Sequence, residues 1–478
     1  MKLQKLLQGV EVRKLSADPA MEISGMAFDS RKVCRGDLFM AVSGFATDGN
    51  RFIPAAMEKG AAVVVTAKEP EQDVPYVLVA SDRLAMAQIA ANLHDHPAEK
   101  LCMIGVTGTN GKTSVTLLLK HILETVRGAK VGLVGTMENL IGDEVIPTER
   151  TTPESPDLQA LFAKMVDAGC GYAIMEVSSH ALALDRVGGV RYDVAAFTNL
   201  TEDHLDFHKT MEEYCRAKAV LFTRCGKAVA NRDDGWFSKI TADAACPLLT
   251  TSVAGDGDLT ARDLELLSDG IRFTAVHGGR EVPVQLPIPG KFTVYNVLTV
   301  LGIALQLGIS LEESAEALKT AKGVKGRVEV VPTPGKDYTV LIDYAHSPDG
   351  LENVLSSVKG FCKGRLIAVF GCGGDRDPVK RPIMGKIGTQ IADIAVITSD
   401  NPRTENPHAI IEDIVAGVKP EDGEYIVVED RRAAIRYAMD IAEKNDIIVL
   451  AGKGHETYQE INGVKNHLDE REEVAKYL

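Results

Sequence analysis

The stretch LCMIGVTGTNGKTS at residues 101–114 decides the fold of this chain. Its apolar first half predicts a buried strand, and the glycines that follow predict a tight turn. After the turn, apolar residues recur at the three- and four-residue spacing of one helix face: Val115, Leu118, Leu119, Ile122 and Val126. Gly128 is typical of a helix C-cap, so the stretch predicts a strand, a turn and an amphipathic helix in succession.

The turn also has the chemistry of a phosphate-binding loop. Its residues are Gly108, Thr109, Asn110, Gly111, Lys112, Thr113 and Ser114. Glycines let backbone N–H groups surround a phosphate, and the helix N-terminus adds its dipole. Lys112 would reach the β- and γ-phosphates of a nucleotide, and the Thr113 hydroxyl would bind Mg²⁺. The general loop has a further Gly where this chain has Val106, so this is a variant, and a glycine-rich turn without a ligand is the alternative.

The rest of the chain repeats the strand–turn–helix pattern. Because 478 residues exceed what one hydrophobic core accommodates, we expect about three domains. We place their boundaries near Pro97 and residue 329, which gives the ranges 1–97, 98–328 and 329–478. The fold class is therefore α/β, with a central doubly wound parallel sheet between an N-terminal α/β domain and a C-terminal Rossmann-like α/β domain. Ligands of such sheets lie beyond the carboxyl ends of the strands.

Composition and charge exclude several classes of function. The chain is 45% apolar and 25% charged, an ordinary globular mixture, and its formal net charge is −14. A negative surface argues against nucleic acid and anionic membranes as partners. No apolar run approaches the roughly 20 residues of a membrane span, so we expect no membrane insertion. The eight cysteines are scattered without a CxxC pair, which indicates reduced thiols in a cytoplasmic protein.

Three residues in the middle of the chain, Glu176, His204 and His208, could serve a metal or acid–base chemistry. Glu176 ends an apolar strand and is of the right type to bind Mg²⁺, although a structural carboxylate is the alternative. His204 is an unusual ligand for Mg²⁺ and could equally be a satisfied loop histidine. Lys218 lies in an expected helix, where the simplest interpretation is a surface lysine with a solvated head group.

Polar loops after strands in the last third of the chain are the other candidates. The segment from Asp400 through Asn401 and Pro402 to Arg403 offers an anion and a cation on one loop, which suits a zwitterion, with a simple Pro turn as the alternative. The segment AGKGHE at 451–456 adds Lys453, His455 and Glu456 on a second glycine-rich loop.

Together the motifs resemble the Mur ligases, the ATP-dependent amide-forming enzymes of peptidoglycan synthesis. Within that family they look like the subgroup that adds the third residue of the stem peptide to UDP-MurNAc-L-Ala-D-Glu. The motifs that carry the resemblance run along nearly the whole chain: FDSR at 28–31, TGTNGKT at 107–113, TTPE at 151–154, MEVSSHAL at 175–182, TEDHLDFH at 201–208, YCRAKAVLF at 214–222, GKFTVYN at 290–296, GRVE at 326–329, DYAHSP at 343–348, GCGGDRDPVKRP at 371–382, DNPR at 400–403 and GKGHE at 452–456.

The resemblance implies a site for ATP and Mg²⁺. Asn296 would contact adenine, and Arg327 and Asp343 would lie near the ribose and phosphates. Lys218 matches the lysine that the family carbamylates with CO₂ or bicarbonate, which replaces the surface interpretation. The resemblance thus implies that catalysis depends on Lys112, Glu176, His204 and Lys218. It also implies two Mg²⁺ ions, one held by Thr113 and Glu176 and a second held by His204 and the Lys218 carbamate.

The resemblance also implies where the other substrates bind. The UDP and muramoyl-dipeptide contacts, with the loop at 43–46 among them, would come from Ser30, Arg31, Ser43, Gly44, Thr151, Thr152, Ser178 and Arg186. DNPR is the subgroup's signature for meso-diaminopimelate, whose extra carboxylate an Arg can pair. The contacts to this amino acid would come from Arg376, Asp400, Asn401, Pro402, Arg403, Gly452 and Glu456.

The expected reaction joins diaminopimelate to the D-Glu γ-carboxylate through an acyl phosphate made from ATP. L-lysine as the added amino acid is one alternative, a folylpolyglutamate synthase is a more distant one, and a non-catalytic nucleotide-binding switch is the alternative of another class. The family resemblance implies a monomer.

Overall fold

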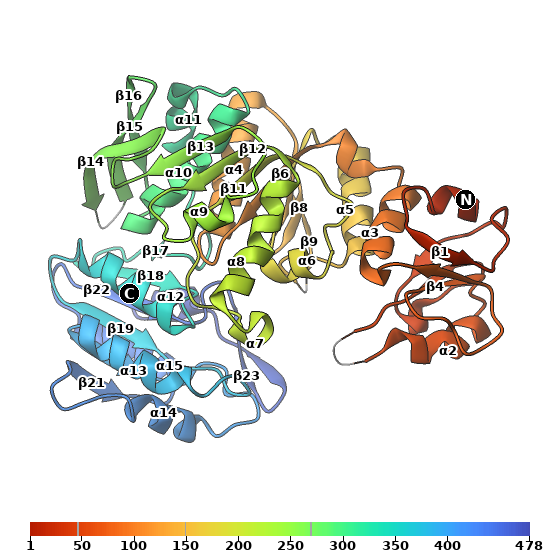
Figure 1. Ribbon diagram of the computed structural model, residues 1–478. Coiled ribbons are helices and arrows are strands. Elements are labelled where there is room, and N and C mark those ends of the chain that lie inside the picture. Colours follow the sequence, from red (N-terminus) through yellow and green to blue (C-terminus); the bar gives the residue numbers. More distant parts are fainter. Residues whose placement is uncertain (45–46, 149, 268–269) are drawn as a thin grey trace.

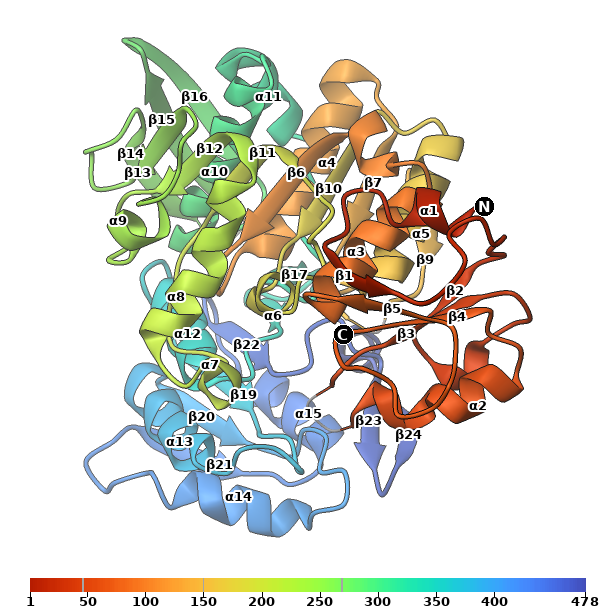
Figure 2. The ribbon, with the colours of Figure 1, turned by 45° about the vertical axis from the view of Figure 1, so that its right-hand side comes forward.

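Three large sheets and one hairpin organise the chain. The computed structural model describes residues 1–44, 47–148, 150–267 and 270–478. The sheets occupy three separate bodies, with the N-terminal body beside the central one and the C-terminal body beneath it (Figures 1 and 2). The predicted three-domain α/β architecture is confirmed.

The N-terminal sheet has the strand order β1-β5-β4-β3-β2, parallel except for β1. Its elements are α1 (Leu3–Leu6), β1 (Val12–Leu15), β2 (Met26–Ala27), β3 (Leu38–Ala41), α2 (Ile53–Glu58), β4 (Val63–Thr66), β5 (Tyr76–Val79) and α3 (Asp82–Leu93). Helix α3 contacts α5 (Ser155–Asp167) of the central body, which fixes the junction between the two.

The central sheet has eleven strands in the order β16-β15-β14-β13-β12-β11-β6-β10-β7-β8-β9. Its strands are β6 (Cys102–Thr107), β7 (Val131–Val134), β8 (Asn139–Ile141), β9 (Glu144–Ile146), β10 (Tyr172–Glu176), β11 (Tyr192–Phe197), β12 (Cys225–Asn231), β13 (Leu248–Ser252), β14 (Leu259–Leu267), β15 (Gly270–His277) and β16 (Arg280–Leu286). Its helices are α4 (Lys112–Arg127), α5, α6 (Ser179–Ala183), α7 (Leu205–His208), α8 (Met211–Ala219), α9 (Phe237–Ile240), α10 (Lys291–Gln306) and α11 (Leu311–Leu318).

Helices cover both faces of the central sheet. One buried cluster joins the strands to α4, α10 and α11, and another joins them to α5, α6 and α8. Helix α4 buries the predicted apolar face, and Gly128 ends it in the left-handed region at φ 59°. The predicted doubly wound sheet is therefore confirmed for the strands from β14 to β7, which are parallel.

The central sheet is antiparallel at both edges. Strands β14, β15 and β16 pair antiparallel on one side, and β7, β8 and β9 do so on the other. Glycines with positive φ form the tight turns, at Gly278 and Gly279 between β15 and β16 and at Gly142 between β8 and β9. A two-residue glycine turn needs no helical crossover, so these strands fold back directly.

The C-terminal sheet has the order β17-β18-β22-β19-β20-β21, parallel except for β17. Its elements are β17 (Glu329–Val331), β18 (Thr339–Asp343), α12 (Pro348–Lys359), β19 (Leu366–Phe370), α13 (Lys380–Ile391), β20 (Ile394–Ile397), α14 (Pro407–Val415), β21 (Glu424–Val427), α15 (Arg431–Ile441), β22 (Ile447–Ala451) and α16 (Glu470–Lys476). The hairpin of β23 (Tyr458–Ile461) and β24 (Val464–His467) follows β22.

None of the described helices is long and apolar enough to cross a membrane.

Candidate active site

A cavity of about 710 Å³ lies where the central and C-terminal bodies face each other. Its walls include the phosphate-binding loop, Glu176 at the end of β10 and Asn296 of α10 from the central body. Arg327 and the residues that follow β18 close it from the other side. The carboxyl ends of parallel strands from two sheets thus meet at one space, which is where open α/β sheets bind ligands.

The predicted phosphate-binding loop follows β6 and has a backbone that excludes larger residues. Gly111 has a φ of 85°, and a Cβ there would lie 2.3 Å from Oδ1 of Asn296. A Cβ on Gly108 would lie 1.9 Å from Oγ1 of Thr198. The loop therefore packs directly on its neighbours, and the N–H groups of Thr109 and Asn110 donate to Asn199. Helix α4 begins at Lys112, so the loop still leads into a helix N-terminus, the arrangement that binds phosphate.

Lys112 folds back over this loop. Its Nζ donates hydrogen bonds of 2.9 Å to the carbonyl of Gly108 and 2.8 Å to that of Thr109. Burial lowers the pKa of Lys112, while the carboxylate of Glu176 acts in the opposite direction. A phosphate in the loop would supply the opposite charge that this ammonium lacks among its carbonyl partners.

Glu176 connects the loop to the next strand end. Its Oε1 accepts hydrogen bonds from Oγ1 of Thr113 at 2.9 Å and from the backbone N–H of Thr136 at 3.0 Å, and its Oε2 accepts one from Oγ1 of Thr136 at 2.9 Å. The side chain is buried. A hydroxyl and a carboxylate in contact are hard oxygen ligands of the kind Mg²⁺ prefers. Thr136 is a partner that the sequence reasoning missed.

No cluster of three or more His, Cys, Asp or Glu side chains able to hold a metal occurs within the described ranges. Mg²⁺ keeps several waters and is usually held by one or two protein oxygens together with substrate phosphates. The pair of Thr113 and Glu176 fits that mode of binding, in which the nucleotide supplies the remaining ligands.

Lys218 is buried, with 1% of its surface exposed, so the surface interpretation is wrong. Its Nζ donates a 2.9 Å hydrogen bond to the carbonyl of Gly108 and lies 4.6 Å from the centre of the Tyr214 ring. Burial, reinforced by the positive charge of Lys112, lowers the pKa of Lys218 well below its usual value. Lys218 lies in the last turn of α8, which is followed directly by a short 3-10 helix at Val220–Thr223.

His204 belongs to a cluster of three histidines. Its ring lies 4.9 Å from that of His180, which in turn lies 5.5 Å from that of His208. His204 has a φ of 55°, and its side chain is about half exposed at the cavity. Burial lowers the pKa of all three imidazoles, and the positive charge of Lys218 acts in the same direction. Neighbouring histidines lower the pKa of His180 and His208 further, while Asp203 raises that of His204. His180 was missed, although the SSH segment at 178–180 contained it.

The residues expected to contact the dipeptide gather beside Glu176. Oγ1 of Thr152 donates to the Glu176 carbonyl at 2.8 Å, and the N–H of Ser178 donates to the same hydroxyl at 3.2 Å. Arg186 donates to the Thr152 carbonyl at 3.1 Å and pairs with Glu154, yet its Nε is buried and without a partner among the described residues. Oγ1 of Thr151 contacts that of Thr136 at 3.1 Å.

The residues expected to hold UDP lie in the N-terminal body, and none of them lines the cavity. Arg31 is exposed and pairs with Asp29, beside Ser30 in a short 3-10 helix. The N–H of Ser43 donates to Asp82 at 2.8 Å. Ser43 and Gly44 form the first half of the loop at 43–46 expected to bind UDP, and residues 45 and 46 lie outside the described residues.

Arg327 and Asp343 meet at the C-terminal wall of the cavity. The Arg327 guanidinium lies 4.9 Å from the centre of the Tyr344 ring. Asp343 accepts hydrogen bonds of 2.8 Å from the backbone N–H groups of Val328 and Ala345, and burial raises its pKa. Asn296, by contrast, packs against Gly111 of the phosphate loop.

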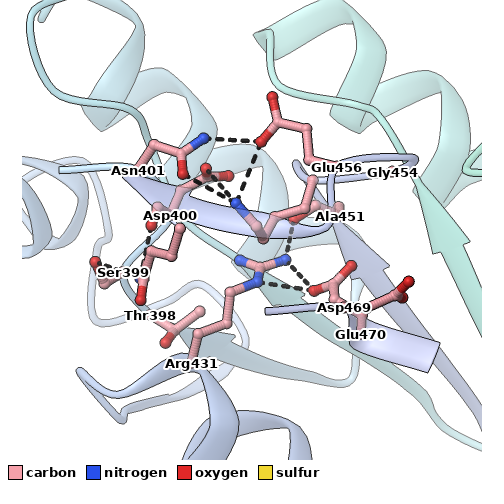
Figure 3. Close-up of polar contacts among 12 residues, drawn as sticks. Thr398, Ser399, Asp400, Asn401, Arg431, Ala451, Gly454, Glu456, Asp469 and Glu470 are labelled. Atoms are coloured by element: carbon pink, nitrogen blue, oxygen red, sulfur yellow. Dashed lines mark hydrogen bonds and ion pairs between the residues drawn. The ribbon is translucent and has the colours of Figure 1, made fainter. Parts of the chain in front are cut away.

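A second polar cluster lies in the C-terminal body, after β20 and β22 (Figure 3). Nδ2 of Asn401 donates to Oε2 of Glu456 at 2.8 Å. Gly452 has a φ of 116°, and a Cβ there would lie 2.4 Å from Oδ2 of Asp400, so only glycine allows this close approach. The structure therefore brings together the two loops that the sequence offered separately.

The two predicted arginines lie beside this cluster. Arg403 donates to the Gly374 carbonyl at 2.7 Å and its Nε lies 3.4 Å from Oε2 of Glu460. Arg376 is exposed and donates to the Asp375 carbonyl. Pro402 packs with its carbonyl against Gly374. A Cβ on Gly373 would lie 2.9 Å from Nη1 of Arg403 and 4.0 Å from Cγ of Arg376, so both side chains approach one glycine.

A phosphate-binding loop that faces a second α/β body across a cavity defines a multidomain nucleotide-binding protein. Three family models match the chain: "Mur ligase family, catalytic domain" at 22–97, "Mur ligase middle domain" at 106–304 and "Mur ligase, glutamate ligase domain" at 326–454. The chain therefore belongs to the Mur ligase family.

Individual relatives are similar over their whole length. A UDP-N-acetylmuramoyl-L-alanyl-D-glutamate–2,6-diaminopimelate ligase of Clostridium acetobutylicum is 47% identical, over 100% of this chain and 99% of the relative. The ligase of the same name from Caldanaerobacter subterraneus is 48% identical with the same coverage. A solved structure of a ligase of that name has a TM-score of 0.74 at 31% identity, covering 100% of this chain and 98% of the other.

Proposed function

We propose that this chain is an ATP-dependent ligase that adds meso-diaminopimelate to the D-Glu γ-carboxylate of UDP-MurNAc-L-Ala-D-Glu in peptidoglycan synthesis. The observation that carries the proposal is the cavity in which the phosphate loop, Glu176 and the C-terminal wall meet. The names of the full-length relatives supply the substrates.

The first half-reaction makes the D-Glu carboxylate reactive. A carboxylate does not acylate an amine at neutral pH, so its oxygen takes the γ-phosphoryl group of ATP and ADP leaves. Lys112 lies where it offsets the charge of two approaching anions. Mg²⁺, held by Thr113 and Glu176 with the phosphate oxygens, would supply further positive charge to the same oxygens.

The second half-reaction forms the amide. The diaminopimelate amine attacks the acyl phosphate, a tetrahedral intermediate collapses, and phosphate leaves while the amine loses a proton. The cluster around Asp400, Asn401 and Glu456 would hold the amino acid, and Arg403 and Arg376 would pair its carboxylates. L-lysine lacks the carboxylate that diaminopimelate has at the end of its side chain, so it would leave one arginine unpaired.

Carbamylation of Lys218 is part of the proposal. The lowered pKa favours the neutral form of the amine, whose lone pair would attack CO₂ to form a C–N bond with release of one proton. The Lys218 amine donates a hydrogen bond to the Gly108 carbonyl, whereas the carbamate is an anion. After carbamylation the end of the side chain must therefore turn away from that carbonyl, toward His204. With His204 it would hold a second Mg²⁺.

The ranges 1–97, 98–328 and 329–478 are proposed as the UDP-binding, ATP-binding and amino-acid-binding domains. Ser30, Arg31 and Ser43 would anchor the nucleotide end of the substrate, and Thr151, Thr152, Ser178 and Arg186 its peptide end. We also propose that the chain acts as a monomer in the cytoplasm, where its eight cysteines, all unpaired here, remain reduced.

Phosphate release tests the reaction class. Purified chain with ATP and Mg²⁺ is expected to release phosphate only when the UDP-muramoyl-dipeptide and an amino acid are both present. ATP turnover that does not depend on the dipeptide would contradict a ligase and support a nucleotide-binding switch.

A further inference from the structure

Lys453 lies at the centre of the amino-acid cluster, and the proposed reaction assigns it no role. It follows β22 in the second glycine-rich loop and is fully buried, with 0% of its surface exposed. Its Nζ donates to Oδ1 of Asn401 at 3.0 Å and to Oε2 of Glu456 at 3.2 Å, and lies 3.8 Å from Oδ1 of Asp400. Each of these three partners belongs to the set proposed to bind the amino acid.

The loop itself is held by other contacts. Arg431, also fully buried, donates to the Ala451 carbonyl at 2.8 Å and pairs with Glu470 at 2.7 Å. The N–H of Gly452 donates to the Asp343 carbonyl at 3.0 Å. These bonds hold the backbone where the loop leaves β22. The loop therefore does not depend on the ammonium of Lys453, whose hydrogen bonds go to the side chains around it.

The charges of the cluster do not cancel. Asp400 and Glu456 are two carboxylates, and Lys453 is the one cation within 4 Å of both in the described part of the chain. Burying a cation is costly unless it is paired and hydrogen-bonded, and here the pairing consumes one of the two negative charges. One negative charge remains, which matches a single substrate ammonium.

We infer that Lys453 is a positioning and specificity residue for the amino-acid substrate. It holds Asn401 and Glu456 in one geometry, and its charge limits the cluster to one ammonium. This inference rests on the proposed function. Without Lys453, the cluster would carry two uncompensated carboxylates, which favour L-lysine, an amino acid with one net positive charge, over diaminopimelate, which has none.

The test compares wild-type chain with Lys453→Met in the phosphate-release assay. We expect the KM for diaminopimelate to rise at least about 10-fold, while the KM for ATP stays within about 2-fold. We also expect the ratio of kcat/KM for diaminopimelate to that for L-lysine to fall at least about 10-fold. The double variant K453M/E456Q restores the net charge and should recover most of that ratio.

Arg365→Met is the matched control. Arg365 pairs with Asp446 at 2.7 Å at the opposite end of β22, so its loss disturbs the same strand without touching the cluster. Nucleotide binding and thermal melting show whether each variant is folded. Equal effects of K453M and R365M on the amino-acid KM, or an unchanged substrate ratio in folded K453M, would overturn the inference. A wild-type chain that uses neither amino acid would instead refute the proposed function.

Should K453M fail to fold, Asn401→Asp gives a second test. It adds a negative charge beside Lys453, and we expect it to shift the ratio toward L-lysine in the same direction. A shift toward diaminopimelate, or none, would overturn the role of charge in the cluster.

Discussion

Asn110 of the phosphate-binding loop donates a 3.0 Å hydrogen bond from Nδ2 to Oδ2 of Asp349, in the first turn of α12. The hydroxyl of Thr201 donates to the same carboxylate oxygen at 2.9 Å. One acidic side chain of the C-terminal body thus accepts bonds from two loops of the central body. The position of the amino-acid site is thereby tied to the loop proposed to hold ATP.

Asp349→Ala removes both of these bonds. We expect kcat to fall about 5- to 10-fold, because a typical intramolecular hydrogen bond contributes roughly 1 kcal/mol, which is about a factor of 5, and the two bodies then align less well. Asp349→Asn keeps an acceptor oxygen and should lose less. Steady-state kinetics of both variants measure this, and equal activity of D349A and wild type would show that the contact is not used.

Lys112→Met should abolish the ligase reaction. Removing a preorganised cation from the transferring phosphoryl group typically costs at least about 100-fold in rate. The UDP-muramoyl-dipeptide should still bind, since its proposed contacts come from other elements. Lys164→Met, on the exposed face of α5, is the control and should leave the rate unchanged. A K112M chain with more than a tenth of wild-type activity would refute the role of this lysine.

The carbamate on Lys218 predicts a dependence on CO₂. Chain freed of bicarbonate should lose activity and regain it when bicarbonate is added, and ¹³C-labelled bicarbonate should give a carbamate signal in the NMR spectrum. Lys218→Arg cannot form the carbamate and should be inactive at any bicarbonate concentration. Plain lysine in a fully active sample would remove the modification from the account.

His208 should make the fold sensitive to acid. Burial, with His180 and Lys218 nearby, lowers its pKa from 6.5 to about 4, and its Nε2 contacts the hydroxyl of Ser179 at 2.9 Å. The unfolded chain therefore binds a proton between pH 6.5 and 4 that the folded chain does not, so stability falls as the pH drops through this window. Burial also lowers the pKa of His180 and His204, which adds to the loss of stability in acid. The negative charge of Asp206 raises the pKa of all three histidines and so reduces that loss.

Thermal melting between pH 7 and 4 checks this prediction. The melting temperature of His208→Gln should depend less on pH than that of wild type, while His408→Gln, exposed on α14, should follow wild type. Parallel curves for H208Q and wild type would assign the acid sensitivity to other groups.

Local sequence signals predicted the centre of the fold better than its edges. The apolar spacing from Val115 to Ile122 depends only on the face of one helix, so it identified α4. The antiparallel edge strands depend on hairpin turns, and the Gly278–Gly279 pair was a signal that the search for βα units passed over.

The site shows the same division. The phosphate loop is contiguous in sequence, so its residues were found together. The burial of Lys218, the contact of Thr136 with Glu176 and the meeting of Asn401 with Glu456 depend on strands that are adjacent only in the folded sheets. No spacing in the sequence encodes such contacts, and only the resemblance to a family gave Lys218 a role.

The choice of amino acid tests the central claim most directly. Purified chain receives ATP, Mg²⁺ and UDP-MurNAc-L-Ala-D-Glu with either meso-diaminopimelate or L-lysine, and phosphate release gives kcat/KM for each. Because one of the two arginines, Arg403 or Arg376, would lack a carboxylate partner when lysine binds, we predict a preference for diaminopimelate of at least about 100-fold. Equal use of the two amino acids, or a preference for L-lysine, would contradict the account.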